Sequence, residues 1–141
     1  MAEDLLSPLL QIFVGRTCAV ERQENHWAFA FGEGADLGVG VPWRIVTNTG
    51  IAFADTDDNQ LFGLPQPVDG QALTNELLAG RRVIGFHVDA KTADIRILFE
   101  GDVRLEMFNN SSGYEGWSAV VQKDGKMTSV LGLGGGEVAI Y

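Results

Sequence analysis

The sequence predicts an α+β domain made mostly of antiparallel strands with two short helices, and three observations lead to this fold class. Apolar and polar residues alternate over several short runs separated by glycines, which is typical of half-buried hairpins. Two stretches carry leucines at helical spacing behind residues that cap helices. The order of helix, Gly-Arg, strand, hairpin and Trp-containing strand occurs twice. We therefore expect one domain over residues 1–141, built as two similar helix-plus-meander halves.

The clearest strand pair lies within Ala93–Trp117. Two runs alternate there, with the apolar residues at odd positions: Ile95, Ile97 and Phe99, then Val103, Leu105 and Met107. A slip of one residue would turn one of these sets to water, so the two sets share a face only across the three-residue loop 100–102. The expected pairs are Phe99 with Val103, Ile97 with Leu105, Ile95 with Met107 and Arg96 with Glu106.

The first helix is predicted to begin at Ser7-Pro8, because serine caps helices and proline is tolerated at the first helical position. Gly15 can end it in a left-handed turn. The strands expected next are 16–22, then 27–31 with 37–41 as a hairpin (Phe31 opposite Leu37, Phe29 opposite Val39), then 43–46 and 51–53.

The polar stretch 55–69 contains two prolines and is expected to be the longest connection. Asp69 can cap a second helix that carries Leu73, Leu77 and Leu78 and ends at Gly80. The strands expected in this part are 81–89, with Ile84, Phe86 and Val88 on one face, then the pair described above, then 117–121 and 126–131 joined at Asp124-Gly125, and finally 138–141.

The repeated order suggests an internal duplication of residues 7–64 and 69–141. Gly15-Arg16 corresponds to Gly80-Arg81, and Trp43 corresponds to Trp117. Each half alone would leave an apolar face uncovered, so the halves are expected to pack about a pseudo-twofold axis and fold as one unit. The alternative is a meander of hairpins that aligns with itself without any duplication.

Composition and charge narrow the function classes. The net charge of −9 argues against sequence-independent nucleic-acid binding, which needs cationic contacts to phosphate, and it fits a basic partner. The acidic start is unlike a secretory signal, and no apolar run reaches the roughly 18 residues that cross a membrane. We therefore expect a cytoplasmic protein without membrane contact. Unpaired strand edges are compatible with a homodimer.

A resemblance is carried by Trp43-Arg44, by the strand after Gly80-Arg81 and above all by the run Ser-Ser-Gly-Tyr-Glu-x-Trp that ends at Trp117. These motifs resemble a family of small bacterial proteins of unknown function, over most of the chain after the first helix. The resemblance implies a bacterial, cytoplasmic protein of one domain. It brings no activity, cofactor or catalytic residue.

Five residues are candidates for binding a ligand or a partner: Trp43, Arg44, Tyr114, Glu115 and Trp117. Aromatic residues with a polar group are over-represented at interfaces. If the two halves face one cleft, Arg44 and Glu115 form its polar floor and suit an anionic or zwitterionic ligand. The alternative is that Trp117 fills the core and Glu115 pairs with Arg44 or Arg81.

Metal, cofactor and catalytic motifs are incomplete. Asp55–Asn59 starts like a calcium loop, but Gln60 and Gln66 stand where that loop needs glycine and glutamate. Cys18 is not spaced from either histidine as zinc ligands are. The glycine-rich stretch 132–137 is neither a P-loop nor a dinucleotide fingerprint. The sequence therefore predicts no metal, no cofactor and no catalytic residue.

Two function classes remain. The first is a non-catalytic bacterial interaction protein, for example an acidic, immunity-type protein that blocks a basic toxin by charge complementarity. The second is a small-ligand-binding protein or an enzyme with a cleft between the halves. A deep pocket with converging polar groups would favour the second class, and a convex acidic patch flanked by exposed aromatic residues would favour the first.

Overall fold

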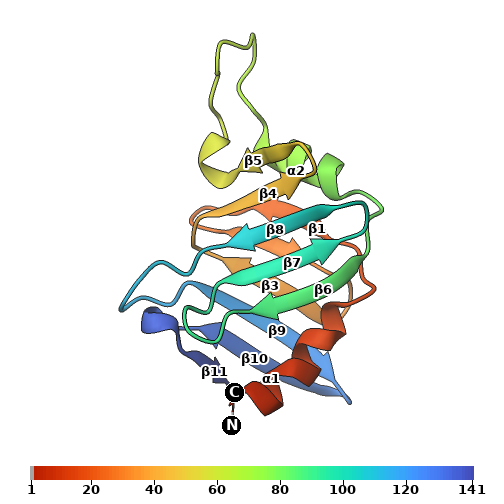
Figure 1. The fold of residues 1–141 in the computed structure, drawn as a ribbon, viewed down its shortest axis with the longest axis vertical. Coiled ribbons are helices and arrows are strands. Elements are labelled where there is room, and N and C mark those ends of the chain that lie inside the picture. Colours follow the sequence, from red (N-terminus) through yellow and green to blue (C-terminus); the bar gives the residue numbers. More distant parts are fainter. Residues whose placement is uncertain (1) are drawn as a thin grey trace.

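The computed structural model describes residues 2–141, with side chains from residue 5 onward, and shows two antiparallel sheets packed face to face (Figure 1). One sheet has the order β1-β2-β3-β9-β10-β11, and the other has the order β5-β4-β8-β7-β6. No helix within residues 2–141 has the length and apolar character needed to span a bilayer. The strands are β1 Ala19–Arg22, β2 Trp27–Ala30, β3 Ala35–Val39, β4 Trp43–Thr47, β5 Gly50–Ala54, β6 Val83–Val88, β7 Ile95–Phe99, β8 Val103–Met107, β9 Trp117–Lys123, β10 Lys126–Gly132 and β11 Val138–Ile140.

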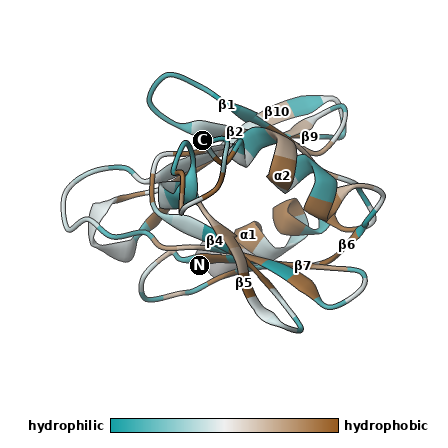
Figure 2. Ribbon diagram, turned by 90° about the horizontal axis from the view of Figure 1, so that it is seen from above, coloured by the Kyte–Doolittle hydropathy of each residue, from teal (hydrophilic) through white to brown (hydrophobic). Residues whose placement is uncertain are grey.

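The two helices lie between the layers (Figure 2), and Figure 1 shows α2 toward the β5 end of the molecule and α1 toward the β11 end. The first, α1, spans Ala2–Leu10 and continues into the 3-10 helix η1, Gln11–Phe13. The second, α2, spans Gly70–Leu78 and begins at Asp69, whose side chain accepts the N–H of Ala72. The predicted fold class, α+β with mostly antiparallel strands and two short helices, is confirmed.

Each helix bridges the edge strands of the two sheets. Helix α2 contacts β1 and β5, whereas α1 contacts β11 and η1 contacts β6. Each sheet also combines a three-strand meander with strands from elsewhere in the chain: β1–β3 continue into β9, β10 and β11, and β6–β8 continue into the hairpin of β4 and β5. Helix α2 therefore lies at the edges β1 and β5, and α1 with η1 lies at the edges β11 and β6; β1 and β6 are the first strands of the two meanders.

The β7–β8 hairpin has the predicted register. Phe99 pairs with Val103, Ile97 with Leu105, Ile95 with Met107 and Arg96 with Glu106. The apolar members of these pairs are buried in the core between the sheets. The sequence predicts this register because it is the one that puts both apolar sets on the same buried face.

The predicted register of the β2–β3 hairpin is wrong by two residues. Phe29 pairs with Leu37 and Trp27 with Val39. The turn is tighter than predicted because Gly32 and Gly34 both adopt positive φ, which lets the N–H of Phe31 reach the carbonyl of Ala35 at 2.9 Å. The apolar residues still share a face, since a shift of two keeps the alternation.

Helix α1 begins at Ala2, upstream of the predicted start, and Pro8 lies inside it. Leu6, Leu9 and Leu10 are buried along one side of this helix. That apolar stripe runs through Ser7-Pro8, so burying it outweighs the one backbone hydrogen bond that proline removes.

Strand β6 does not present Ile84 with Phe86 and Val88, as the alternation predicted. The register against β7 shifts between Val83 and Gly85, which is a β-bulge. The extra residue turns Ile84 outward, where 61% of it is exposed, while Phe86 stays buried.

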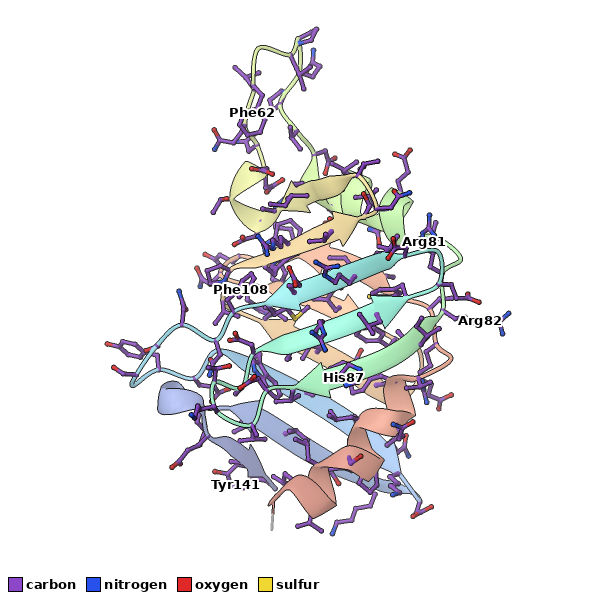
Figure 3. The ribbon with its side chains drawn as sticks, viewed as in Figure 1. Phe62, Arg81, Arg82, His87, Phe108 and Tyr141 are labelled. Atoms are coloured by element: carbon purple, nitrogen blue, oxygen red, sulfur yellow. The ribbon has the colours of Figure 1, made fainter. Side chains whose placement is uncertain are left out.

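The connection 55–69 projects from one end of the molecule and carries the exposed side chains of Leu61, Phe62 and Leu64 (Figure 3). Phe62 and Gly63 both have positive φ, and the N–H of Leu64 donates to the carbonyl of Leu61 at 2.7 Å. The tip is therefore a tight turn of the type found in two-residue hairpins.

Candidate functional site

The two candidate tryptophans belong to the core. Trp43 and Trp117 are 1% and 2% exposed. The indole N–H of Trp117 donates to the carbonyl of Ala93 at 2.8 Å, whereas that of Trp43 has no hydrogen-bond partner among the described residues. Trp43 packs edge-on against the rings of Trp27 and Phe29. Their position is that of packing residues, because neither ring is accessible to a ligand.

Arg44 and Glu115 are not brought together. The guanidinium of Arg44 pairs with Glu106 at 2.7 Å and lies over the ring of Phe108. Glu115 is exposed and borders a shallow hollow on the other sheet, together with His26 and Ser118. Tyr114 is 83% exposed on the same loop as Glu115.

The Arg44–Glu106 pair also includes Arg104, whose Nε lies 3.3 Å from Glu106. Partial burial of Glu106 opposes its ionisation, but hydrogen bonds from both arginines outweigh this and lower the pKa of the carboxyl. Both arginines thus engage the one carboxylate of this cluster, on the outer face of the sheet, and Glu106 is not free for acid–base chemistry.

The structure does not bring Cys18 and the histidines together as a nucleophile–base pair or a metal site. Cys18 is buried, and burial raises the pKa of its thiol, which keeps the sulfur protonated. Cys18 directly precedes β1, whereas His87 is exposed on β6 of the other sheet (Figure 3). Within residues 2–141, no group of three or more His, Cys, Asp or Glu side chains is placed to hold a metal ion.

The carboxylates of the calcium-like stretch each have a partner within the protein. Asp55 accepts the N–H of Trp43 at 3.2 Å, and Asp57 accepts that of Ala54 at 3.0 Å. Asp58 accepts two hydrogen bonds from Arg22, at 2.5 and 2.6 Å, and one from the N–H of Gly70 at 2.8 Å. The acidic stretch therefore attaches the projecting connection to β1 and α2.

Asp58 predicts an acid-sensitive step in stability. Partial burial opposes its ionisation, but the bonds from Arg22 and Gly70 outweigh this and lower its pKa below the usual value. A lowered pKa in the folded state adds stability at neutral pH, and this stability is lost as the pH falls below about 4, where the unfolded carboxyl protonates. We expect Asp58→Asn to be less stable than the wild type at pH 7 and the difference to shrink toward pH 3. Urea titrations at several pH values measure it, and a pH-independent difference would contradict it.

An apolar groove lies between α1 and the edge strand β6, with a volume of about 750 Å³. This is within the usual size of ligand-binding pockets. Its apolar side chains come from both elements, from neighbouring strands and from the segments that follow η1 and β6: Leu6, Leu10, Val14, Ile84, Phe86, Val88, Ala90, Leu98 and Val138. Phe86 is fixed in place because its ring stacks on that of Phe13, with the centroids 4.4 Å apart.

The lining of the groove is more apolar than polar, and Ser7 and Gln11 are its uncharged polar side chains. Its ionisable lining residues are His87 and Asp89. The carboxylate of Asp89 accepts the N–H groups of Lys91 and Thr92, at 2.9 and 3.0 Å, and these bonds lower its pKa. The groove thus offers apolar contact rather than a converging set of catalytic groups.

Sequence reasoning missed this groove for two reasons. The predicted helix began after Leu6, and the predicted alternation buried Ile84. The available signal was the spacing of Leu6 and Leu10 by one helical turn, followed by Val14.

Comparison of the chain with protein-family models, with curated proteins and with solved structures gave no match.

Proposed function

We propose that this chain is a non-catalytic interaction protein that binds a segment of a partner protein in the α1–β6 groove. The observation that carries the proposal is the groove itself, where side chains such as Leu10, Ile84 and Val88 converge. Exposed, contiguous apolar surface of this kind marks binding sites on proteins. The groove's carboxylate is occupied by backbone N–H groups, which does not suit acid–base catalysis.

The charge of the chain supports a basic partner. A net charge of −9 attracts basic proteins over distances of about a Debye length, roughly 8–10 Å. An immunity-type protein that blocks a basic toxin is one form of this function, in the cytoplasm of a bacterium. Electrostatic attraction would speed association, and the apolar groove would supply the short-range contact.

We also propose that the two meanders derive from an internal duplication within one folding unit. Corresponding pairings support it: Val39 faces Trp117 in one sheet, and Met107 faces Trp43 in the other. The two Gly-Arg sequences also act alike, because Arg16 and Arg81 each donate to a carbonyl at the turn of the following hairpin, namely that of Glu33 and that of Glu100.

A matched pair of isoleucines tests the groove. Ile84 lines it, whereas Ile51 lies on β5, the opposite edge strand of the same sheet; their exposed fractions are 61% and 60%. Peptides selected by display against the wild type should bind Ile84→Gln about tenfold to a hundredfold more weakly, as loss of one buried isoleucine contact predicts. Ile51→Gln should bind them as the wild type does.

Two outcomes would contradict the proposal. The first is a panel of peptides that bind Ile84→Gln and the wild type equally. The second is the failure to select any peptide, together with a metabolite library in which one compound raises the melting temperature of the wild type. The second result would favour the alternative function, a small-ligand-binding protein or an enzyme with a cleft between the two halves.

A further inference from the structure

Strand β1 is an edge strand, and side chains of α2 form hydrogen bonds with the backbone groups on its outer side. The carboxamide of Asn75 accepts the N–H of Val20 and donates to its carbonyl, both at 2.8 Å. The carboxamide of Gln71 accepts the N–H of Arg22 at 3.0 Å. These two side chains occupy the positions at which another strand would pair, so the β1 edge of this sheet is not available for strand addition.

Strand β6 is an edge of the other sheet, and its backbone groups that point away from the sheet are those of Phe86 and Val88. Strand β6 pairs on one side only, with β7. The carbonyl of Arg82 accepts from Glu100, and the N–H of Asp89 donates to Asp94, so both residues direct their backbone groups toward β7. In an antiparallel pair this direction alternates along the strand. The backbone N–H and carbonyl groups of Gly85 and His87 therefore point toward β7, and those of Phe86 and Val88 point away from β7, toward the groove.

The bulge separates this free part of the edge from a part that is already paired. The N–H and carbonyl of Val83 are bonded to Arg16 and Gly15, each at 2.8 Å. Beyond the bulge, no hydrogen bond from a described residue other than those of β7 reaches the edge at Phe86 or Val88. The free edge is therefore short and lies alongside the groove.

Helix α1 presents aliphatic side chains at this edge. Leu6 and Leu10 line the groove with the same four-residue spacing that Gln71 and Asn75 have on α2. In the alignment of the two Gly-Arg sequences, Leu6 corresponds to Gln71 and Leu10 to Asn75. Leucine offers no hydrogen bond, so α1 borders the edge of β6 without closing it.

We infer that the α1–β6 groove takes an extended segment of a partner protein as an added strand, which pairs with the backbone of Phe86 and Val88. This inference rests on the proposed function and names its mode of recognition. Strand addition at a sheet edge beside a helix gives affinity through main-chain hydrogen bonds and specificity through alternate side chains. The backbone N–H and carbonyl groups of the segment supply at β6 the hydrogen bonds that Asn75 and Gln71 supply at β1 of the other sheet.

The groove defines the chemistry of the segment. Every second side chain of an added strand would point toward Leu6, Leu10 and Val138, and these side chains should be apolar. The side chains between them would face solvent near Asp89 on a chain of net charge −9, where lysine or arginine fits. Because α1 stands beside the edge, the groove admits a single strand more readily than the edge of a second folded copy.

The first test measures amide hydrogen exchange of the full chain by NMR, with and without a labelled peptide of about ten residues in which valine and lysine alternate. The amides of Phe86 and Val88 should exchange quickly in the free protein and at least about tenfold more slowly in the complex, as expected for a new hydrogen bond. The amides of Gly85 and His87 bond to β7 in both states and serve as the internal control. Unchanged exchange at Phe86 and Val88 while the peptide is bound would overturn the inference.

The second test changes the peptide and leaves the protein intact. N-methylation at one of two adjacent valine–lysine positions removes an N–H that faces β6, and methylation at the other removes one that faces solvent. We expect only one of these two peptides to lose affinity, by about tenfold. Equal affinities would exclude strand addition, as would equally tight binding of a peptide with the valines in one block.

The third test closes the edge. Leu10→Asn places on α1 the carboxamide that Asn75 places on α2, and it should weaken the alternating peptide at least about tenfold. The matched control is Leu9→Asn, which changes a neighbouring buried leucine that does not line the groove. If both variants unfold, the exchange measurement on the wild type decides alone.

The outcomes separate the mode of recognition from the proposed function. Peptides whose binding needs Ile84 but does not protect the amides of Phe86 and Val88 would refute strand addition and leave the proposed function standing. Peptide binding that is insensitive to Ile84→Gln would refute the proposed function itself. A concentration-dependent dimer that protects these amides without peptide would replace the partner segment by a second copy.

Discussion

Phe13→Ala is expected to lower the free energy of unfolding by about 3–5 kcal/mol, the usual cost of truncating a buried phenylalanine. The ring of Phe13 is fully buried and lies edge-on to Phe31, 5.0 Å away, and stacked on Phe86, 4.4 Å away. Phe31 follows β2 of one sheet and Phe86 belongs to the other, so this ring joins the two layers where η1 enters. Domains are stable by only about 5–15 kcal/mol, so the loss is a large fraction of the total.

Urea denaturation followed by tryptophan fluorescence measures this loss. Phe62→Ala is the control, because Phe62 is 66% exposed at the tip of the projecting connection and its truncation should change stability by less than about 0.5 kcal/mol. A loss below about 1 kcal/mol for Phe13→Ala would show that the ring does not join the sheets.

Gly136→Ala is expected to destabilise the protein by roughly 3 kcal/mol or more. Gly136 has a φ of 96°, a backbone angle that residues other than glycine rarely adopt. A Cβ atom there would also lie 2.1 Å from the carbonyl oxygen of Lys91, a backbone atom that cannot rotate away. The loop that contains Lys91 is held by Asp89 and by the bond from Trp117 to Ala93, so it has little freedom to retreat.

Gly113→Ala is the matched control for this substitution. Gly113 belongs to the neighbouring loop, is not at positive φ, and has no atom within 4 Å of the position that a Cβ would take. Its melting temperature should stay within a few degrees of the wild type. Calorimetry of both variants decides, and a Gly136→Ala protein as stable as Gly113→Ala would contradict the close contact with Lys91.

Local structure was predictable where a single physical signal dominates. Asp69 and Gly80 mark the two ends of α2, and Gly80 indeed has positive φ. Asp124-Gly125 predicts a two-residue turn, and both residues adopt the positive φ that such a turn needs. The β7–β8 register followed from alternation alone, because only one pairing buries both apolar sets.

The arrangement of the hairpins and the groove were not predictable in the same way. Alternation tells which face of a strand is buried, but it does not tell which strand lies beside it, so the pairing of β3 with β9 was not foreseen. The bulge at Ile84 locally reverses the alternation of buried and exposed side chains, so the sequence pattern alone does not predict the groove that Ile84 lines. The sequence does not distinguish Trp43 and Trp117 as binding residues from packing residues, because a core aromatic and an interface aromatic have the same sequence signal.

The exchange of hairpins between the sheets has a consequence for synthesis of the chain. Strand β3 pairs with β9, and β4 pairs with β8, so each sheet contains a seam between residues that are separated by much of the chain. Loop-closure entropy must be overcome before such distant pairs form, which slows folding. During translation, β1–β3 emerge from the ribosome well before the strand that covers their inner edge. The nascent chain must therefore keep the edge of β3 soluble until β9 has been made.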